Sequence, residues 1–192
     1  SGRSTASIIR VGFGLAAVGV ALLISVIPAA SSGWPLCFPL LVVGSGLGLL
    51  VSQLNNFTLA PLEEERVSEG AGVNSASGSF GLSFGLAVAG AVLLIVLAAS
   101  FTDMTESSEV IPPDQKQQIS TSLEDDAEVM SNTQVEQLLV DEPPDVADEV
   151  LRINEDSNDR ALQAALLVPL IASLIGFMNG FRMLRLPEEP AI

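Results

Sequence analysis

The chain has 192 residues, 48% of them apolar, with a mean hydropathy of +0.50 and a formal net charge of −15. An ordinary soluble domain does not combine these values, so the apolar and acidic residues must lie in different parts of the sequence. The acidic balance excludes a nucleic acid partner, and one cysteine without histidine excludes disulfides and Cys/His zinc sites within the chain. Three uncharged stretches remain as candidates for the membrane: 11–62, 70–102 and 161–181.

The first uncharged stretch predicts two membrane helices, at 8–30 and 36–60. A bilayer core of about 30 Å needs about 20 apolar residues in a helix, and this stretch is too long for one crossing. Pro28 and Pro35 interrupt it near the middle, which predicts a helical hairpin. We expect Trp34, beside the turn, to be an anchor at the membrane interface.

The second and third stretches predict one membrane helix each. The helix at 71–101 has a first half rich in Gly, Ser and Asn, residues that gain little from insertion into lipid, so this half is expected to pack against other helices. The helix at 161–181 contains Pro169, where a kink is expected, and is closed by Arg182 and Arg185. This helix and the tail that follows it form the final region of the chain, 161–192.

Small residues recur four positions apart in three of the predicted helices. Such spacing lets helix backbones approach closely in lipid, where association depends on van der Waals contact. The alternative is that glycine is simply common in membrane helices. Because three helices share the pattern, we predict a bundle in which these positions pack: Gly44, Gly48, Ser77, Gly81, Gly85, Gly176 and Gly180.

The distribution of arginine predicts the orientation in the membrane. An even number of spans places both termini on one side, and five arginines collect there: Arg3, Arg10, Arg66, Arg182 and Arg185. By the positive-inside rule this side is the cytoplasm, so the C-terminus is expected to be cytoplasmic and segment 103–160 to lie outside. The opening Ser1-Gly2, without a Met, indicates a truncated protein.

Segment 103–160 holds most of the charge, with 17 acidic and 3 basic side chains. Proline pairs precede Asp114 and Asp145, and Thr133 with Glu136 has the spacing of a capping box, so short amphipathic helices are expected. A cation site at the carboxylates 124–126 has no EF-hand spacing, and a solvated acidic face is the favoured interpretation. The apolar stripes of these helices are Ile119, Leu123, Ala127 and Met130, and then Val146, Val150 and Ile153.

Few residues in the predicted spans could carry chemistry. None of the four spans has a titratable side chain well inside it, and no catalytic constellation, metal site or cofactor motif is present, so we predict that the chain is not an enzyme. The amides of Gln53, Asn55 and Asn56 are conspicuous because they need hydrogen-bond partners in a membrane. Hydrogen bonding between helices is the favoured role, and contact with a substrate is the alternative.

Several runs resemble the late part of a bacterial drug:proton antiporter of the major facilitator superfamily, of the fourteen-helix kind. The most specific runs are 53–61 (QLNNFTLAP), 70–78 (GAGVNSASG) and 82–87 (LSFGLA). The closing runs 165–169 (ALLVP) and 181–187 (FRMLRLP) resemble the last helix of that family. The long acidic segment departs from the common pattern of the family.

The resemblance implies an all-α integral membrane protein of the inner (plasma) membrane, in which the four spans are helices eleven to fourteen. It also implies that the second span lines a central cavity, which makes Gln53 and Asn55 stronger candidates for residues that contact a substrate. The expected function is proton-coupled solute or drug export by alternating access, with the lipid bilayer, the other helices and a small-molecule substrate as partners. The alternative is a free-standing four-helix membrane protein whose external acidic segment, 103–160, binds a partner or a cation.

Overall fold

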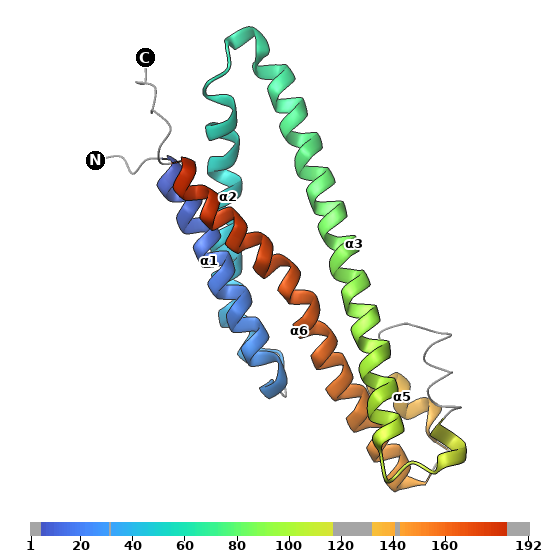
Figure 1. The fold of residues 1–192 in the computed structure, drawn as a ribbon. Helices are drawn as coiled ribbons and strands as arrows, with labels where there is room; N and C mark the ends of the chain where they lie inside the picture. The colour runs from blue at the N-terminus through green and yellow to red at the C-terminus, as the bar shows by residue number, and fades with distance from the viewer. Residues whose placement is uncertain (1–4, 31, 117–131, 141–142, 184–192) are drawn as a thin grey trace. The chain divides into compact units, whose positions relative to one another are not determined.

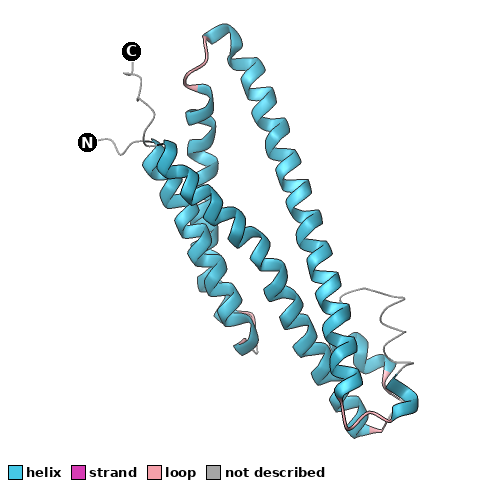
Figure 2. Cartoon of the chain, in the orientation of Figure 1, coloured by secondary structure: helices cyan, strands magenta, loops and turns pink. Residues whose placement is uncertain are grey.

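The computed structural model describes residues 5–30, 32–116, 132–140 and 143–183. Within these ranges the chain is almost entirely helical and contains no β-strand (Figures 1 and 2). The elements, in chain order, are α1 (Thr5–Val26), the 3₁₀ turn η1 (Ile27–Ala29), α2 (Trp34–Leu59), the 3₁₀ turn η2 (Glu64–Arg66), α3 (Val67–Ser107), α5 (Asn132–Leu138) and α6 (Pro144–Met183).

Four of these helices are long and apolar enough to cross a membrane: α1 with η1, α2, η2 with α3, and α6. The prediction of an all-helical chain with four helices of this kind is therefore confirmed. The hairpin turn also lies where the prolines predict it, because Pro28 is in the first turn of η1 and Pro35 is in the first turn of α2. Trp34 opens α2 and is 84% exposed.

The structure differs from the expected bounds in the third helix, which runs from Val67 to Ser107 rather than over 71–101. At its start, Glu69 lies in the first turn, where a negative side chain interacts favourably with the helix dipole. At its end, Phe101 and Thr105 are buried, so packing stabilises turns that polar composition alone would assign to a loop.

A second difference concerns the acidic segment, whose last part is not a separate short helix. Helix α6 begins at Pro144 and continues without a break through Arg160 and Pro169 to Met183. No glycine or proline lies between Asp145 and Val168, so nothing in the backbone ends the helix where the sequence changes from acidic to apolar. Hydropathy marks a membrane boundary within α6, and this boundary is not a helix boundary.

The chain divides into two compact units, to both of which α3 and α6 contribute. Unit 1 comprises residues 1–87 and 166–192, and unit 2 comprises residues 88–165. In unit 1, α1 and α2 touch through glycines. A Cβ added at Gly46 would lie 2.7 Å from the Ala16 nitrogen and 2.7 Å from the Gly12 carbonyl oxygen, and one added at Gly19 would lie 2.7 Å from the Val43 nitrogen.

The C-terminal part of α6 packs against α1 within the same unit. Gly176 lies against the Phe13 ring, and a Cβ added at Gly14 would lie 3.3 Å from the Phe177 ring. Gly180 faces Arg10, whose Cβ and Cγ would both lie 3.2 Å from an added Cβ. Glycines thus provide the close approach on both helices.

The predicted packing positions divide into two groups. Gly176 and Gly180 lie at the contact with α1. The second group consists of Ser77, which is exposed, and four glycines at which an added Cβ would meet no described atom within 4 Å, so that their packing role stays a prediction: Gly44, Gly48, Gly81 and Gly85. The glycine of α2 that does touch α1 is Gly46, which points to the opposite side of that helix from its neighbours two residues away.

Unit 2 has an apolar core of its own. The predicted stripe of Val146, Val150 and Ile153 is buried there, which confirms that part of the amphipathic pattern. Phe101 and Ile111 complete the core together with Val135 of α5. The other predicted stripe, at 119–130, and the carboxylates at 124–126 lie outside the described residues.

Candidate functional site

The strongest candidate site in unit 1 is the polar region where α2 ends and α3 begins. Asn55, one of the predicted substrate-path residues, lies on an exposed part of α2. Its Oδ1 accepts a hydrogen bond from Nδ2 of Asn74 on α3. A side-chain hydrogen bond between helices is expected of an amide in a membrane, where an unpaired polar group is costly.

The other two predicted amides are placed differently. Gln53 is half-buried and Asn56 is exposed, and neither side chain forms a hydrogen bond with a described residue. The structure therefore brings Asn55 to the α2–α3 contact and leaves Gln53 and Asn56 outside it. Asn74 is the partner that the substrate-path prediction missed. The signal for it is the hairpin itself, because a turn at 60–66 brings the end of α2 beside the start of α3.

Hydroxyl groups in the same region are satisfied by their own helix. The Thr58 hydroxyl donates to the Leu54 carbonyl oxygen at 2.9 Å. Ser45 and Ser52 likewise donate to carbonyl oxygens of α2, at 2.7 Å and 3.1 Å. Each hydroxyl thus uses its one donor within α2, so it can join a neighbouring helix only as an acceptor. The amide pair is therefore the direct polar link between α2 and α3 among the residues that the structure describes.

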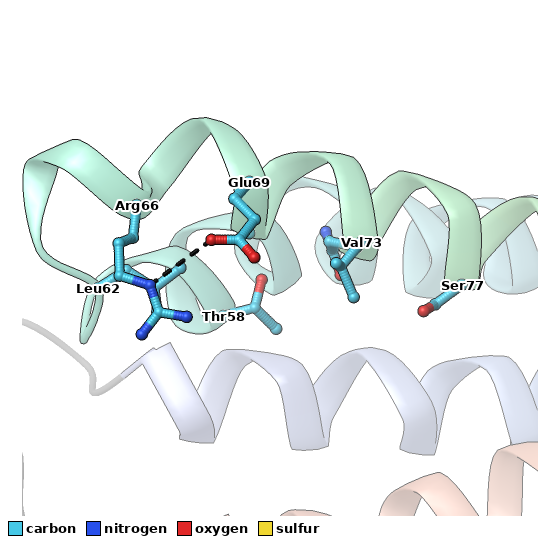
Figure 3. Close-up of a pocket in the computed structure, with 8 residues that line it drawn as sticks. Thr58, Leu62, Arg66, Glu69, Val73 and Ser77 are labelled. Carbon is cyan, nitrogen blue, oxygen red and sulfur yellow. Dashed lines mark ion pairs between the residues drawn. The ribbon is translucent and has the colours of Figure 1, made fainter.

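Next to the amide pair, an open groove of about 340 Å³ lies between the two helices (Figure 3). Gly70 allows the close approach at the turn, because a Cβ there would overlap the Leu62 side chain. Asn74 connects the groove to Asn55. The residues drawn around the groove include Thr58, Leu62, Arg66, Glu69, Val73 and Ser77.

One ion pair lies at the end of this groove. Arg66 Nε and Glu69 Oε2 are 3.6 Å apart, and the two side chains are 65% and 69% exposed. An exposed pair at this spacing contributes between about 0 and 1 kcal/mol, so either partner can exchange the other for a ligand at little cost. In the sequence, Arg66 served only to predict the orientation in the membrane. Its position on the groove is evident from the structure alone.

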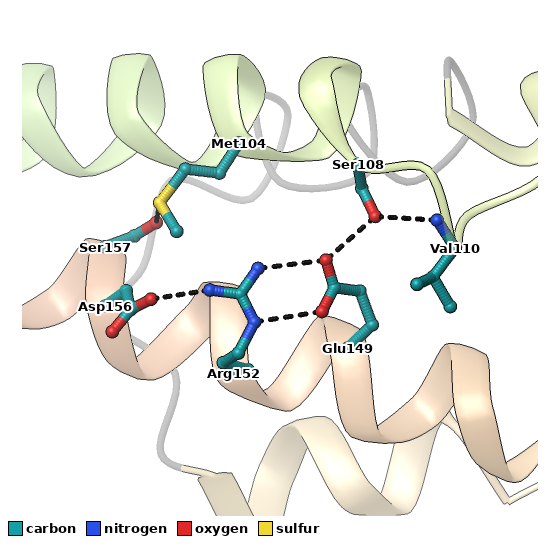
Figure 4. A network of polar contacts seen from close by, with 7 residues as sticks. All are labelled: Met104, Ser108, Val110, Glu149, Arg152, Asp156 and Ser157. Carbon is teal, nitrogen blue, oxygen red and sulfur yellow. Dashed lines mark hydrogen bonds and ion pairs between the residues drawn. The ribbon is translucent and has the colours of Figure 1, made fainter.

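Unit 2 contains a second polar cluster (Figure 4). Arg152 donates from Nε and Nη2 to the two oxygens of Glu149, both at 2.9 Å, and from Nη1 to Asp156 at 2.8 Å. The Ser108 hydroxyl donates to Glu149 at 2.8 Å, which ties the end of α3 to α6. The Ser157 hydroxyl donates to the Met104 sulfur at 3.7 Å. The cluster joins two helices, and its groups are largely engaged with one another.

The electrostatics of this cluster follow from its hydrogen bonds. The bond from Arg152 holds the pKa of Glu149 below its ordinary value against the opposing effect of burial, and the Ser108 bond acts in the same direction. Bonding to Glu149 raises the pKa of Arg152. One turn further on, burial and the nearby Glu155 and Asp156 raise the pKa of Asp159. Glu149 is therefore held charged, whereas Asp159 more readily binds a proton.

The chain carries many carboxylates, the usual ligands of hard cations. In the described ranges no three His, Cys, Asp or Glu side chains are grouped so that they could hold a metal ion. Comparison with known proteins gives no family either, since no protein-family model, curated protein or solved structure matches this chain.

Proposed function

We propose that this chain is the C-terminal part of a secondary active transporter of the major facilitator superfamily, of the fourteen-helix drug:proton antiporter type. The observation that carries the proposal is the Asn55–Asn74 hydrogen bond. It joins the two runs, 53–61 and 70–78, that most resemble that family. In an alternating-access transporter such a bond would hold two helices together beside the solute path.

Uncovered faces of α2 and α3 support a larger bundle. Gly44 and Gly48 on α2, and Gly81 and Gly85 on α3, have no described neighbour within 4 Å of an added Cβ. Small residues at this spacing provide close contact between membrane helices. In the proposed transporter these faces pack against its remaining helices, and other faces contact lipid.

Proton coupling would depend on other helices of the transporter. The four spans offer amides, hydroxyls and backbone groups, none of which changes charge near neutral pH. We therefore assign Asn55 to solute recognition or helix positioning, together with Gln53 and Asn56 as further candidates on the solute path. The proposed location is the inner (plasma) membrane, with the C-terminus in the cytoplasm.

A second function is favoured by the separate core of unit 2. Phe101, Ile111 and Ile153 are almost completely buried within residues 88–165, so this unit has the packing of a small domain. A free-standing membrane protein could use its acidic surface to bind a basic partner or a cation. This alternative requires no solute path through unit 1.

The decisive experiment measures transport by the complete polypeptide that contains this chain. The polypeptide is reconstituted in vesicles with an imposed pH gradient, and movement of ethidium is followed by fluorescence. We expect gradient-driven flux that Asn55→Ala reduces and that the 192-residue chain alone does not support, because four helices form less than one of the two bundles that alternating access needs.

Two controls make this experiment specific. A proton ionophore should abolish the flux, and the conservative change Asn55→Gln should retain more activity than Asn55→Ala because it keeps an amide. Gradient-driven flux from the 192-residue chain alone would refute the proposal. Absence of flux with a panel of cationic and neutral solutes, together with tight binding of a basic protein to unit 2, would favour the second function.

A further inference from the structure

The groove between α2 and α3 changes character along its length. Arg66 and Glu69 place one positive and one negative group at one end, and both are largely exposed. Leu62 adds apolar surface at this same end, and Val73 does so further along α3, where small and polar side chains up to Ser77 complete the lining. From Arg66 to Ser77 the helix rises by about 16 Å, at about 1.5 Å per residue.

This length reaches from the headgroup region into one leaflet. The expected membrane span of α3 begins at residue 71, so Ser77 lies about 9 Å inside a hydrocarbon core that is about 30 Å thick. Its charged end lies beside η2, where two candidate membrane helices, α2 and α3, are joined. The groove therefore offers two opposite charges at headgroup depth and, deeper along α3, the apolar side chain of Val73 beside small and polar side chains.

We propose that this groove binds one phospholipid whose headgroup carries a primary ammonium beside its phosphate, as in phosphatidylethanolamine. The phosphate binds the Arg66 guanidinium, which can donate two parallel hydrogen bonds to it. The ammonium binds the Glu69 carboxylate, and an acyl chain lies along Val73 towards Ser77. The proposal depends on insertion of the helices in a bilayer and not on transport.

Charge complementarity selects this class of lipid. Arg66 Nε and Glu69 Oε2 are 3.6 Å apart, and the phosphate and ammonium of the headgroup are also neighbours. Each protein group can therefore exchange its ion-pair partner within the protein for the headgroup's group of opposite charge. A choline headgroup has no N–H to donate to Glu69. A glycerol headgroup has no cation, so Glu69 would repel its phosphate.

The groove also accommodates an elongated ligand. Its volume of about 340 Å³ lies within the range of roughly 300–1,000 Å³ that is usual for small-molecule sites. Gly70 keeps the turn residue Leu62 close to α3, so the groove is closed on the side of the turn. Along its remaining length it is open, as the entry of a lipid from the bilayer requires.

Native mass spectrometry tests the proposal on the 192-residue chain. The protein is released from detergent micelles that contain equal amounts of phosphatidylethanolamine, phosphatidylcholine and phosphatidylglycerol, and the retained lipid is identified by mass. We expect one retained lipid per chain, with phosphatidylethanolamine preferred about two- to fivefold over each of the others, as expected for one exposed charge contact.

Substitutions on the groove assign the two contacts. Glu69→Gln should bring phosphatidylethanolamine down to the level of phosphatidylcholine, whereas Arg66→Gln should weaken retention of all three lipids. Ser77→Phe keeps both charges but fills the groove, and it should also abolish the preference. The matched control is Glu65→Gln, a change at an exposed residue that does not line the groove, and it should leave the preference intact.

Circular dichroism must give the parent helix content for every variant, which the exposure of the substituted side chains favours. Equal retention of the three lipids by the parent protein would overturn the proposal, as would a preference for phosphatidylglycerol. A preference that survives Arg66→Gln combined with Glu69→Gln would overturn it as well. Displacement of the lipid by soluble phosphoethanolamine at low concentration would assign the groove to a soluble zwitterion instead.

Discussion

The guanidinium carbon of Arg10 lies 4.8 Å from the centroid of the Phe181 ring, where the start of α1 meets the end of α6. Gly180 makes this approach possible, because an added Cβ would already lie 3.2 Å from the Arg10 side chain. The cation–π contact stabilises the two helices at the level where a membrane protein places its arginines. Residues far apart in sequence thus fix the first and last spans together.

Gly176→Leu should destabilise the 192-residue chain by about 1–3 kcal/mol, the usual cost of overpacking. The reason is local: a Cβ at this position already overlaps the Phe13 ring. The measurement is the unfolding free energy in mixed micelles, followed by circular dichroism. Gly85→Leu is the matched control, since a Cβ there meets no described atom within 4 Å, and it should leave this chain as stable as the parent.

In the complete polypeptide, Gly85→Leu should lower expression and detergent stability. The proposed transporter packs this face of α3 against another helix, which the larger side chain would displace. Thermal stability of the purified complete protein gives the answer. If the variant were as stable as its parent in that protein as well, the packing role of Gly85 would be wrong.

Asn55 and Asn74 should show coupled energetics. A double-mutant cycle with Asn55→Ala and Asn74→Ala should give a coupling free energy of about 0.6 kcal/mol, the average measured for hydrogen bonds between membrane helices. Unfolding of the 192-residue chain in mixed micelles provides the values. The same cycle with Asn56→Ala should give no coupling, because Asn56 does not bond to Asn74. Equal coupling free energies in the two cycles would show that the Asn55–Asn74 hydrogen bond does not stabilise the contact between α2 and α3.

Unit 2 should lose stability in acid because of Glu149. Its pKa is lowered in the folded state by the Arg152 hydrogen bond, so the folded state binds fewer protons than the unfolded state. The stabilisation is complete above the ordinary carboxylate pKa of about 4.3 and is lost as the pH falls through the lower folded value. Amide hydrogen exchange of α6 residues in the complete 192-residue chain, measured against pH, reports this loss.

Two substitutions separate the carboxylates in that measurement. Glu149→Gln should make the stability of unit 2 decline less steeply in acid, because the titrating carboxylate is removed. Asp159→Asn should steepen it, because the pKa of Asp159 is raised in the folded state and its contribution runs in the opposite direction, being lost as the pH rises. A Glu149→Gln profile identical to that of the parent would show that other groups control the acid response.

The proposed orientation predicts which sites a membrane-impermeant thiol reagent can reach in intact cells. With Cys37 changed to serine, a cysteine at Thr133 should be labelled, whereas one at Ser68 should be labelled only after the cells are opened. Both positions are exposed, so accessibility depends on the side of the membrane. Labelling at Ser68 but not at Thr133 in intact cells would reverse the orientation.

The sequence by itself determined that the chain forms four membrane-length helices. Hydrocarbon accepts a backbone only when its hydrogen bonds are satisfied within the segment, so length and lack of charge are sufficient signals, as at α1 and α2. The buried stripe of Val146, Val150 and Ile153 was also evident, because amphipathic periodicity is local. The continuity of α6 was not evident from the sequence, because a change from acidic to apolar composition does not end a helix where no glycine or proline interrupts it.

Only the tertiary structure decided which faces meet. On α2, spacing four selected Gly44 and Gly48, yet Gly46 is the residue that touches Ala16 of α1. Several faces of a glycine-rich helix carry small residues, and only the neighbouring helix determines which of them is used. The same holds for the candidate site. Asn55 is one of three amides near the end of α2, and its bond to Asn74 depends on how the α2–α3 turn brings two separate segments together.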